Sequence, residues 1–362
     1  MFLKLFILER LINYFAFMPL MKIAQISPLH ESVPPMLYGG TERDVHYLTE
    51  ELVKMGHEVT LYASGDSKTS AELKPMCKKS LRMDKNCVDP VPDHLYMAER
   101  VCQDSGDFDI IHSHLEYLGF PMLRRAKAPS VTTLHGRLDY PNYVGLFMEF
   151  RDMPLISISN SQRGPLPWAN WIDTVYHGIP KDIYELNEGK GEYLAFLGRI
   201  SPEKGVDKAI KIAERANTPL RIAAKVGKED REYFEEVIMP LIDESNAEFI
   251  GEINEKKKET FLGNASALLF PINWPEPFGL AMIEAMACGT PVIAFPFGSV
   301  PEVIDEGKTG FIVKDVDGAA RSVKKLPLIS RVTCRKIFEK RFTADTNAKN
   351  YLKVYAKLLK EA

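Results

Sequence analysis

The sequence predicts an α/β protein of two domains, each built on a parallel sheet. From Lys22 onward, short apolar strand patterns alternate with helical patterns, which is typical of parallel sheets. A length of 362 residues allows two domains of ordinary size, each with its own core. Residues 181–192 are polar and contain glycine, as a linker does. We expect domains at 21–180 and 193–340, and a C-terminal helix at 341–362 that crosses back to the first domain.

Composition excludes several functional classes. The chain is 45% hydrophobic and 26% charged, and its formal net charge is −3, so no nucleic-acid partner is predicted. Its five cysteines form no CxxC pair, and their odd number fits a reducing environment better than a disulfide framework or structural zinc. We therefore expect a cytoplasmic protein.

The first 20 residues are apolar but are interrupted by Lys4, Glu9 and Arg10. A membrane span needs about 20 apolar residues, and the segment has no signal-peptide cleavage site. Three interpretations stay open: a helix in peripheral contact with a membrane, a helix docked on the body, or an extension upstream of a natural start at Met21. We prefer the extension, because a strand pattern begins at Met21 without it.

The first half of the chain alternates strands with long connections. Strands are predicted at 22–27, 57–64, 108–114, 130–134 and 155–159, and a helix at 44–56. Residues 66–94 are predicted as loop with at most one helix, and 161–171 as loop.

Glycines and histidines stand at the ends of these strands. Gly39 and Gly40 let the backbone approach a ligand at the carboxyl end of the sheet, or form a turn before an N-cap at Thr41. They do not form a GxGxxG fingerprint, so a dinucleotide site has little support. His135 precedes a glycine at a strand exit, where it is placed to donate a hydrogen bond in a cleft or to serve as a structural histidine.

His112 and His114 form an HxH pair at the end of another strand. Such a pair can ligate a metal, but zinc sites use three or four ligands and no third ligand follows at a sensible spacing. We predict ordinary strand-end histidines.

The second half repeats the same alternation. Strands are predicted at 193–197, 220–225, 247–253, 266–271 and 291–295, with helices at 206–216, 230–242, 255–265 and 280–288. A short helix and an edge strand are predicted within 297–313, and the remaining residues are predicted to be helical.

Two cations flank the turn after the first strand of this half. Arg199 and Lys204 stand between the strand and the helix at 206–216, where a guanidinium and an ammonium suit a diphosphate. Charge-assisted hydrogen bonds contribute about 1.5–3 kcal/mol each, whereas a helix dipole contributes roughly 0.3–2 kcal/mol. Two cations would therefore contribute more to binding a diphosphate than the helix dipole does. The alternative is a solvated basic turn.

The most informative stretch runs from residue 273 to residue 295. Its prolines keep a loop out of the helical conformation, and Gly279 admits a tight backbone at the start of the following helix. The N-terminus of that helix suits a phosphate, whereas Glu276 and Glu284 suit sugar hydroxyls. One such glutamate would ordinarily face solvent. Two of them, next to Trp274 and Phe278, favour a ligand site.

From Lys22 to the C-terminus, the sequence resembles glycosyltransferase family 4. The matching motifs are GGTE at 39–42, His135, GRISPEKG at 198–205 and EPFGLAMIE at 276–284. The resemblance implies the GT-B fold, in which two Rossmann-like domains face each other across a cleft. It also implies transfer of a sugar from a nucleotide-sugar with retention of anomeric configuration, without a metal or other cofactor.

The resemblance also implies a role for each matched residue. The basic pair would hold the diphosphate, the first glutamate the transferred sugar, the second glutamate the ribose, and His135 the sugar hydroxyls. The implied catalytic residues are His135, Arg199, Lys204 and Glu276. The implied donor-binding residues are Gly39, Gly40, Arg199, Lys204, Ile253, Glu276, Phe278, Gly279, Leu280 and Glu284.

Donor and acceptor are less defined. The donor base is undefined because backbone contacts read it and leave little trace in the sequence. UDP-glucose is the first choice of donor and GDP-mannose the second. The acceptor is a saccharide, a lipid-linked sugar or a small aglycone. We expect the loops at 32–37 and 162–171, the latter with Trp168 and Trp171, to shape its pocket.

Three other functions compete with this reading. A metal-dependent transferase would use an Asp-x-Asp motif, which 107–109 and 315–317 match in letters, although both positions suggest solvated turns. An epimerase for nucleotide-sugars would share the donor site but need no acceptor. A non-catalytic module would bind the sugar-nucleotide without turnover.

Overall fold

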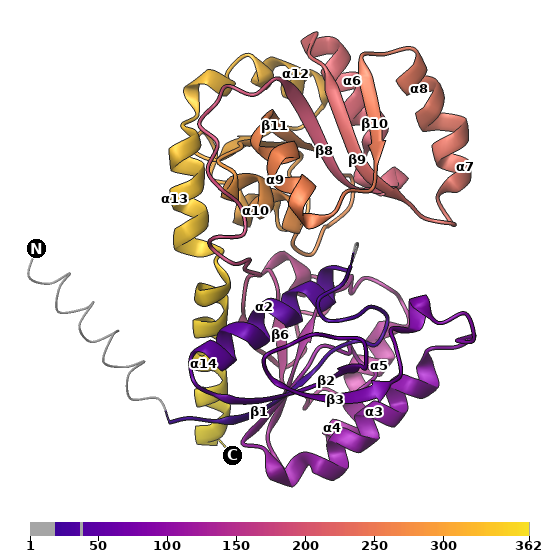
Figure 1. Ribbon diagram of the computed structural model, residues 1–362, viewed down its shortest axis with the longest axis vertical. Helices are drawn as coiled ribbons and strands as arrows, with labels where there is room; N and C mark the ends of the chain where they lie inside the picture. The colour runs from indigo at the N-terminus through magenta and orange to yellow at the C-terminus, as the bar shows by residue number, and fades with distance from the viewer. Residues whose placement is uncertain (1–18, 37–38, 362) are drawn as a thin grey trace, which may run out of the picture.

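The computed structural model describes residues 19–36 and 39–361, and these form two α/β domains stacked end to end (Figure 1). Most of the predicted N-terminal extension lies outside the described residues. Within the described ranges, no helix is both long enough and apolar enough to cross a membrane. The five cysteines are all free thiols.

The first domain contains a seven-stranded parallel sheet in the order β3-β2-β1-β4-β5-β6-β7. Its strands are β1 Lys22–Ile26, β2 Glu58–Ser64, β3 Glu72–Cys77, β4 Ile110–Ser113, β5 Ser130–Leu134, β6 Leu155–Ser157 and β7 Trp171–Thr174. Its helices are α2 Gly40–Lys54, α3 Val91–Asp104, α4 Phe120–Leu123 and α5 Tyr143–Glu149, with 3-10 turns η1 Leu81–Met83, η2 Ser105–Asp107 and η3 Ser161–Arg163.

Both edge strands of this sheet differ from the prediction. β3 lies in a segment predicted as irregular, and β7 begins at Trp171, which was assigned to a loop. Edge strands pair on one side only and keep exposed positions, so neither has the continuous apolar run of a central parallel strand. The start of α2 differs from the alternative that placed its N-cap at Thr41. Gly39 is the N-cap, and Thr41 lies within the helix.

The second domain contains a six-stranded parallel sheet in the order β10-β9-β8-β11-β12-β13. Its strands are β8 Tyr193–Ile200, β9 Leu220–Val226, β10 Ala247–Gly251, β11 Ala265–Phe270, β12 Val292–Ala294 and β13 Gly310–Ile312. Its helices are α6 Val206–Ala216, α7 Arg231–Tyr233, the π-helix η5 Phe234–Ile238, α8 Met239–Asp243, α9 Glu255–Gly263, α10 Leu280–Ala287, α11 Val300–Val303, α12 Val316–Val323 and α13 Arg331–Arg341, with 3-10 turns η4 Pro202–Lys204 and η6 Leu326–Leu328.

Each sheet reverses its strand order at one point, between β1 and β4 and between β8 and β11. Open α/β sheets bind ligands beyond the carboxyl ends of the strands at such a switch point. The two switch points therefore mark where a ligand site is expected in each domain.

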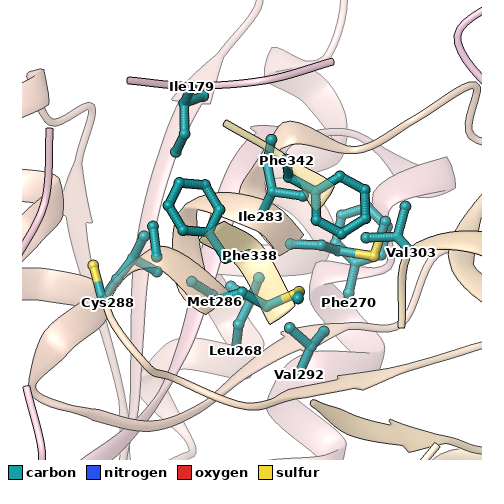
Figure 2. Close-up of a cluster of buried hydrophobic side chains, with 14 of the residues drawn as sticks. Ile179, Leu268, Phe270, Ile283, Met286, Cys288, Val292, Val303, Phe338 and Phe342 are labelled. Atoms are coloured by element: carbon teal, nitrogen blue, oxygen red, sulfur yellow. The ribbon is translucent and has the colours of Figure 1, made fainter. Parts of the chain in front are cut away.

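Helix α10 is buried inside the second domain. Its side chains Met282, Ile283 and Met286 are fully buried, and Figure 2 shows the last two among side chains from β11, β12 and α13. A helix that is apolar on all sides requires cover on all sides. Glu284 is the polar exception, with 4% of its surface exposed. This packing fixes the position of the helix start and of the loop before it.

The last helix, α14 Ala344–Glu361, packs against α2 of the first domain (Figure 1). Tyr351 and Tyr355 on α14 are fully buried with residues of β1 and β4 nearby. The chain crosses between domains where Ile179 exchanges backbone hydrogen bonds with Phe342 and Ala344, at 3.0 and 2.9 Å. The C-terminal segment is thus built into the first domain.

Candidate functional site

A cavity of about 590 Å³ is lined by residues of both domains. It lies at the carboxyl ends of strands at both switch points, since its lining includes residues that follow β1 and β4 in the first domain and β8 and β11 in the second. Every residue that the sequence analysis predicted to be catalytic or donor-binding lines it. These are Gly39, Gly40, His135, Arg199, Lys204, Ile253, Glu276, Phe278, Gly279, Leu280 and Glu284.

The two predicted clamp cations are paired with carboxylates of their own domain. Lys204 forms an ion pair with Glu276, and the two side chains are 17% and 13% exposed. Arg199 lies 3.0 Å from Glu203, 3.4 Å from Glu229 and 3.5 Å from Asp230. These carboxylates hold both cations in place at the cavity wall. An anionic ligand must compete with them for the same donors.

The loop that carries Glu276 is fixed from one side by the residues after β12. Ser299 donates its backbone N–H to the carbonyl of Glu276 at 3.0 Å, and its hydroxyl donates to the carbonyl of Phe278 at 2.6 Å. Gly279 has φ +82, and its left-handed conformation turns the chain into α10. The start of α10, at Leu280 and Ala281, therefore lines the cavity.

Glu284 accepts a hydrogen bond from Lys258 at 2.7 Å. Lys258 also forms an ion pair with Glu255, at 3.5 Å. Glu255 forms a second ion pair with Arg43 of the first domain, at 2.6 Å. A row of alternating charges thus runs across the cavity wall from α10 through α9 to α2. Sequence reasoning missed Lys258 and Arg43, because neither lies in a recognisable motif.

Histidines gather on the first-domain side. His135 lies 2.9 Å from His114, measured from Nε2 to Nδ1, and stacks on His177 with ring centroids 5.2 Å apart. Asp44 lies 2.8 Å from Nδ1 of His177. Only one histidine of the HxH pair, His114, belongs to a cluster that could hold a metal ion: among the described residues, Asp44, His114 and His135 offer atoms within 4.8 Å of one another. His177 had a signal in the sequence, since it precedes a glycine just as His135 does.

Glu116 is a further cavity residue that the sequence did not single out. Its φ is +52, which is uncommon outside glycine and is often found at functional sites. One carboxylate oxygen accepts the backbone N–H groups of His135 and Gly136, at 2.7 and 3.0 Å. Burial raises the pKa of this carboxyl from 4.5 to about 7, against the effect of the two N–H groups.

A Glu116→Gln variant should change how stability depends on pH. Because the folded chain holds a proton on Glu116 that the unfolded chain releases above pH 4.5, this group's contribution to stability is lost as pH rises through about 7. The free energy of unfolding of the wild type minus that of the variant should fall between pH 4.5 and about 7, and should level off above pH 7. Urea titrations over the pH series measure it, and a pH-independent difference would refute the assignment.

Two predictions about other segments need correction or comment. The segments 32–37 and 162–171 were expected to shape an acceptor pocket, but none of their described residues lines the cavity. Gln162 is instead buried and donates to the carbonyls of Leu134 and Gly136, both at 2.9 Å. Other first-domain residues that line the cavity are His30, Arg82, Tyr117 and Tyr143. His30 follows β1, Tyr117 follows β4, Arg82 lies in η1 and Tyr143 begins α5.

The Asp-x-Asp sequences serve local structure. Asp109 accepts the backbone N–H of Lys22 at 2.7 Å, and Asp315 is the N-cap of α12, accepting the N–H of Gly318 at 2.7 Å. Neither is among the cavity residues. They therefore do not form the metal site of a metal-dependent transferase at this cavity.

Comparisons with protein families cover most of the chain. The model described as "Glycosyl transferases group 1" matches residues 180–350, and that described as "Glycosyltransferase Family 4" matches residues 38–172. An uncharacterized glycosyltransferase of Methanocaldococcus jannaschii is 24% identical, over 92% of this chain and 98% of its own. The glycogen synthase of Mycobacterium tuberculosis is 25% identical, over 81% and 83%. The phosphatidyl-myo-inositol mannosyltransferase of Mycolicibacterium smegmatis is 25% identical, over 84% of each chain.

Solved structures share the fold. AviGT4, a glycosyltransferase involved in avilamycin A biosynthesis, has a TM-score of 0.73 at 22% identity, covering 94% of this chain and 99% of its own. Anabaena HepE in complex with UDP and glucose has a TM-score of 0.70 at 17% identity, covering 93% and 100%. At this level of identity the likeness describes the arrangement of the two domains and not their ligands.

Proposed function

The chain is a glycosyltransferase of the family 4 type with the GT-B fold, a hexosyltransferase, and we propose that it transfers a hexose from a nucleoside-diphosphate sugar to an acceptor with retention of configuration and without a metal ion. The observation that carries this proposal is that Arg199, Lys204, Glu276 and Glu284, which come from two separate motifs, line one cavity between the domains. That cavity is also lined by His135 from the other domain.

The diphosphate is proposed to bind between the basic pair and the start of α10. When the bond to the sugar breaks, negative charge develops on the departing diphosphate, and preorganised donors in a partly closed cavity stabilise that charge. Arg199 and Lys204 are held at the cavity wall by their carboxylate partners, with which the diphosphate would compete for the same donors. In this arrangement two protein cations supply the electrostatic stabilisation that a divalent metal supplies elsewhere.

The sugar and ribose are proposed to contact the two glutamates. Glu276 and Glu284 are held by Lys204 and Lys258 respectively, which fixes their oxygens as acceptors for hydroxyl groups. Ile253 follows β10 and lines the cavity beside α9, where its backbone would meet the base. Retention is proposed from the family resemblance, with attack on the same face from which the diphosphate departs.

UDP-glucose is our first choice of donor and GDP-mannose the second. The complex of the structurally similar HepE with UDP and glucose favours the first, and the relative named as a mannosyltransferase keeps the second open. The acceptor side is proposed to be the wall formed by Tyr117, Tyr143, Arg82 and His30, because aromatic faces and a cation suit a sugar or a polar headgroup. We propose that the enzyme works in the cytoplasm, where nucleotide-sugars are expected.

Calorimetric titration with a panel of nucleotide-sugars tests this function. We expect one donor to bind with the same affinity in the presence of excess chelator. A Glu284→Gln variant should bind it at least tenfold more weakly, or about 1.4 kcal/mol, because a ribose acceptor is weakened. Glu235→Gln, an exposed glutamate of η5 away from the cavity, is the matched control.

The outcomes also separate the competing functions. Release of nucleotide only when an acceptor is added supports a transferase, whereas conversion of the donor sugar without an acceptor supports an epimerase. Binding without turnover across an acceptor panel supports a binding module. If no nucleotide-sugar binds, the proposed function is wrong.

A further inference from the structure

A continuous chain of hydrogen bonds connects the cavity histidine to the C-terminal helix. From His135, the chain passes to His114 at 2.9 Å and then to Oε1 of Gln25 at 3.0 Å. The other end of the Gln25 amide donates to the hydroxyl of Tyr355 at 3.1 Å, and this hydroxyl lies 2.7 Å from Nδ1 of His112. His114, Gln25, Tyr355 and His112 each have no exposed surface.

The chain continues to a second tyrosine of α14. Nε2 of His112 lies 2.7 Å from the hydroxyl of Thr133, which lies 3.1 Å from the hydroxyl of Tyr351. A cavity residue after β5 is therefore connected through β1 and β4 to a helix more than 200 residues away in sequence. Buried polar groups are retained where each one is paired, and a paired network restricts its members to one arrangement.

The positions of the protons follow from the Gln25 amide. Its Oε1 can only accept, so Nε2 of His114 carries hydrogen. Burial lowers the pKa of His114 well below 6.5, so this ring is neutral and its Nδ1 is an acceptor. His135 must then donate to it from Nε2. The pKa of His135 is lowered to about 3, mainly by burial, so its Nδ1 carries no hydrogen.

The Nδ1 atom of His135 is the free end of this chain. It is buried and has no hydrogen-bond partner within the part of the protein that the structure describes, although the residue lines the cavity. A bare ring nitrogen accepts a hydrogen bond and cannot donate one. The prediction from the sequence assigned His135 the opposite role, as a donor to a substrate or leaving oxygen.

We propose that His114 and Gln25 are positioning residues that hold His135 as its Nε2–H tautomer, so that its Nδ1 accepts a hydrogen bond from a hydroxyl group of the bound sugar. The inference rests on the proposed function for the identity of the ligand, but the tautomer is a property of the unliganded protein. Tyr355 accepts a hydrogen bond from the Gln25 amide and lies within hydrogen-bond distance of His112, so these two side chains hold the amide in place.

A metal ion at Asp44, His114 and His135 is the competing explanation of this cluster. Zinc requires ligand nitrogens directed at one point at about 2.0–2.1 Å. Both ring nitrogens of His114 are already within hydrogen-bond distance of protein partners. The hydrogen-bond chain accounts for the geometry better.

Nuclear magnetic resonance of the full chain labelled with ¹⁵N-histidine tests the proposal without any ligand. Protonated and bare ring nitrogens resonate far apart, so the spectrum identifies the tautomer directly. We expect the signals that disappear in His135→Gln to show hydrogen on Nε2 and none on Nδ1 at neutral pH. His114→Leu should give a mixture of the two tautomers of His135. His114→Asn should restore the Nε2–H tautomer, because its amide oxygen can take the place of Nδ1 of His114 as the acceptor. His46→Leu, at a partly exposed position of α2, is the control.

Turnover of the donor identified by calorimetry gives the second readout. We expect about a tenfold fall in kcat for His114→Leu, with recovery of most of it in His114→Asn and little change in the affinity for free nucleotide. A general structural role would lower both kcat and nucleotide affinity in both variants. If no donor binds to the wild type, the proposed function fails, yet the tautomer measurement still decides the positioning role.

Three results would overturn the proposal. Hydrogen on Nδ1 of His135 in the wild type would mean that the chain runs in the opposite direction. An unchanged tautomer in His114→Leu would remove the positioning role. One equivalent of zinc in the purified protein, with histidine signals that change when it is chelated, would replace the hydrogen-bond chain with a metal site.

Discussion

Replacing Lys204 by alanine is expected to weaken donor binding about 10- to 100-fold and to lower turnover by about 10²–10³-fold. The ammonium lies at the cavity wall and is 17% exposed, so its interaction with a bound anion is only partly screened by solvent. The loss in turnover should exceed the loss in binding, because charge on the leaving diphosphate is greatest as the bond to the sugar breaks.

Part of this effect arises from the carboxylate that the substitution leaves behind. Glu276 is the ion-pair partner of Lys204, and without the ammonium its negative charge faces the site where a diphosphate would lie. A Lys204→Ala/Glu276→Gln double variant should therefore bind free nucleoside diphosphate more tightly than Lys204→Ala alone. Its turnover should stay low, since both the cation and the proposed sugar contact are missing.

Calorimetry and donor turnover measure both quantities in the same preparations. Lys211→Ala is the matched control, because Lys211 is an exposed lysine of α6 that pairs with Asp207 and does not line the cavity. The double variant forms a cycle with the single variants, so the coupling of the ion pair is obtained separately from each side chain. Donor affinity in Lys204→Ala equal to that of the wild type would remove the diphosphate clamp from the proposed mechanism.

The parts of the site that the sequence predicted are those encoded within short segments. The loop, helix and strand around Glu276 and Glu284 are local, since prolines, Gly279 and an apolar helix specify each turn of the chain. The alternation of strand and helix patterns along the chain likewise predicted the parallel sheets. The two sheets in the structure confirm the α/β fold. The exceptions, β3 and β7, are edge strands whose patterns are too polar to stand out.

The remaining features depend on contacts between distant residues. Gln25 and Tyr355 are 330 positions apart, and each is unremarkable in its own segment. Glu116 draws attention only through its backbone conformation and the two N–H groups it accepts. The pairing of Glu284 with Lys258 likewise arises because α9 and α10 pack together. A single sequence contains no local pattern for such pairs, because the fold alone brings them together.

Gly298 provides the second large effect, because its backbone approaches that of the loop before α10. A Cβ atom on Gly298 would lie 2.2 Å from the carbonyl oxygen and 2.4 Å from the nitrogen of Glu276, and its φ is +57. Gly298→Ala must therefore displace the loop that holds Glu276 against Lys204. We expect a loss of about 3 kcal/mol or more in the free energy of unfolding, and weaker donor binding in the protein that remains folded.

Gly307 supplies the control that separates conformation from contact. It also has a positive φ, +70, but no atom lies within 4 Å of where its Cβ would be. Gly307→Ala should cost only the left-handed conformation, about 1–2 kcal/mol, and leave donor affinity unchanged. Urea unfolding and calorimetry on both variants measure the difference. Both substitutions place alanine at a positive φ, so any larger loss of unfolding free energy in Gly298→Ala arises from the contact with Glu276. Equal losses in the two variants would mean that this contact does not hold the loop.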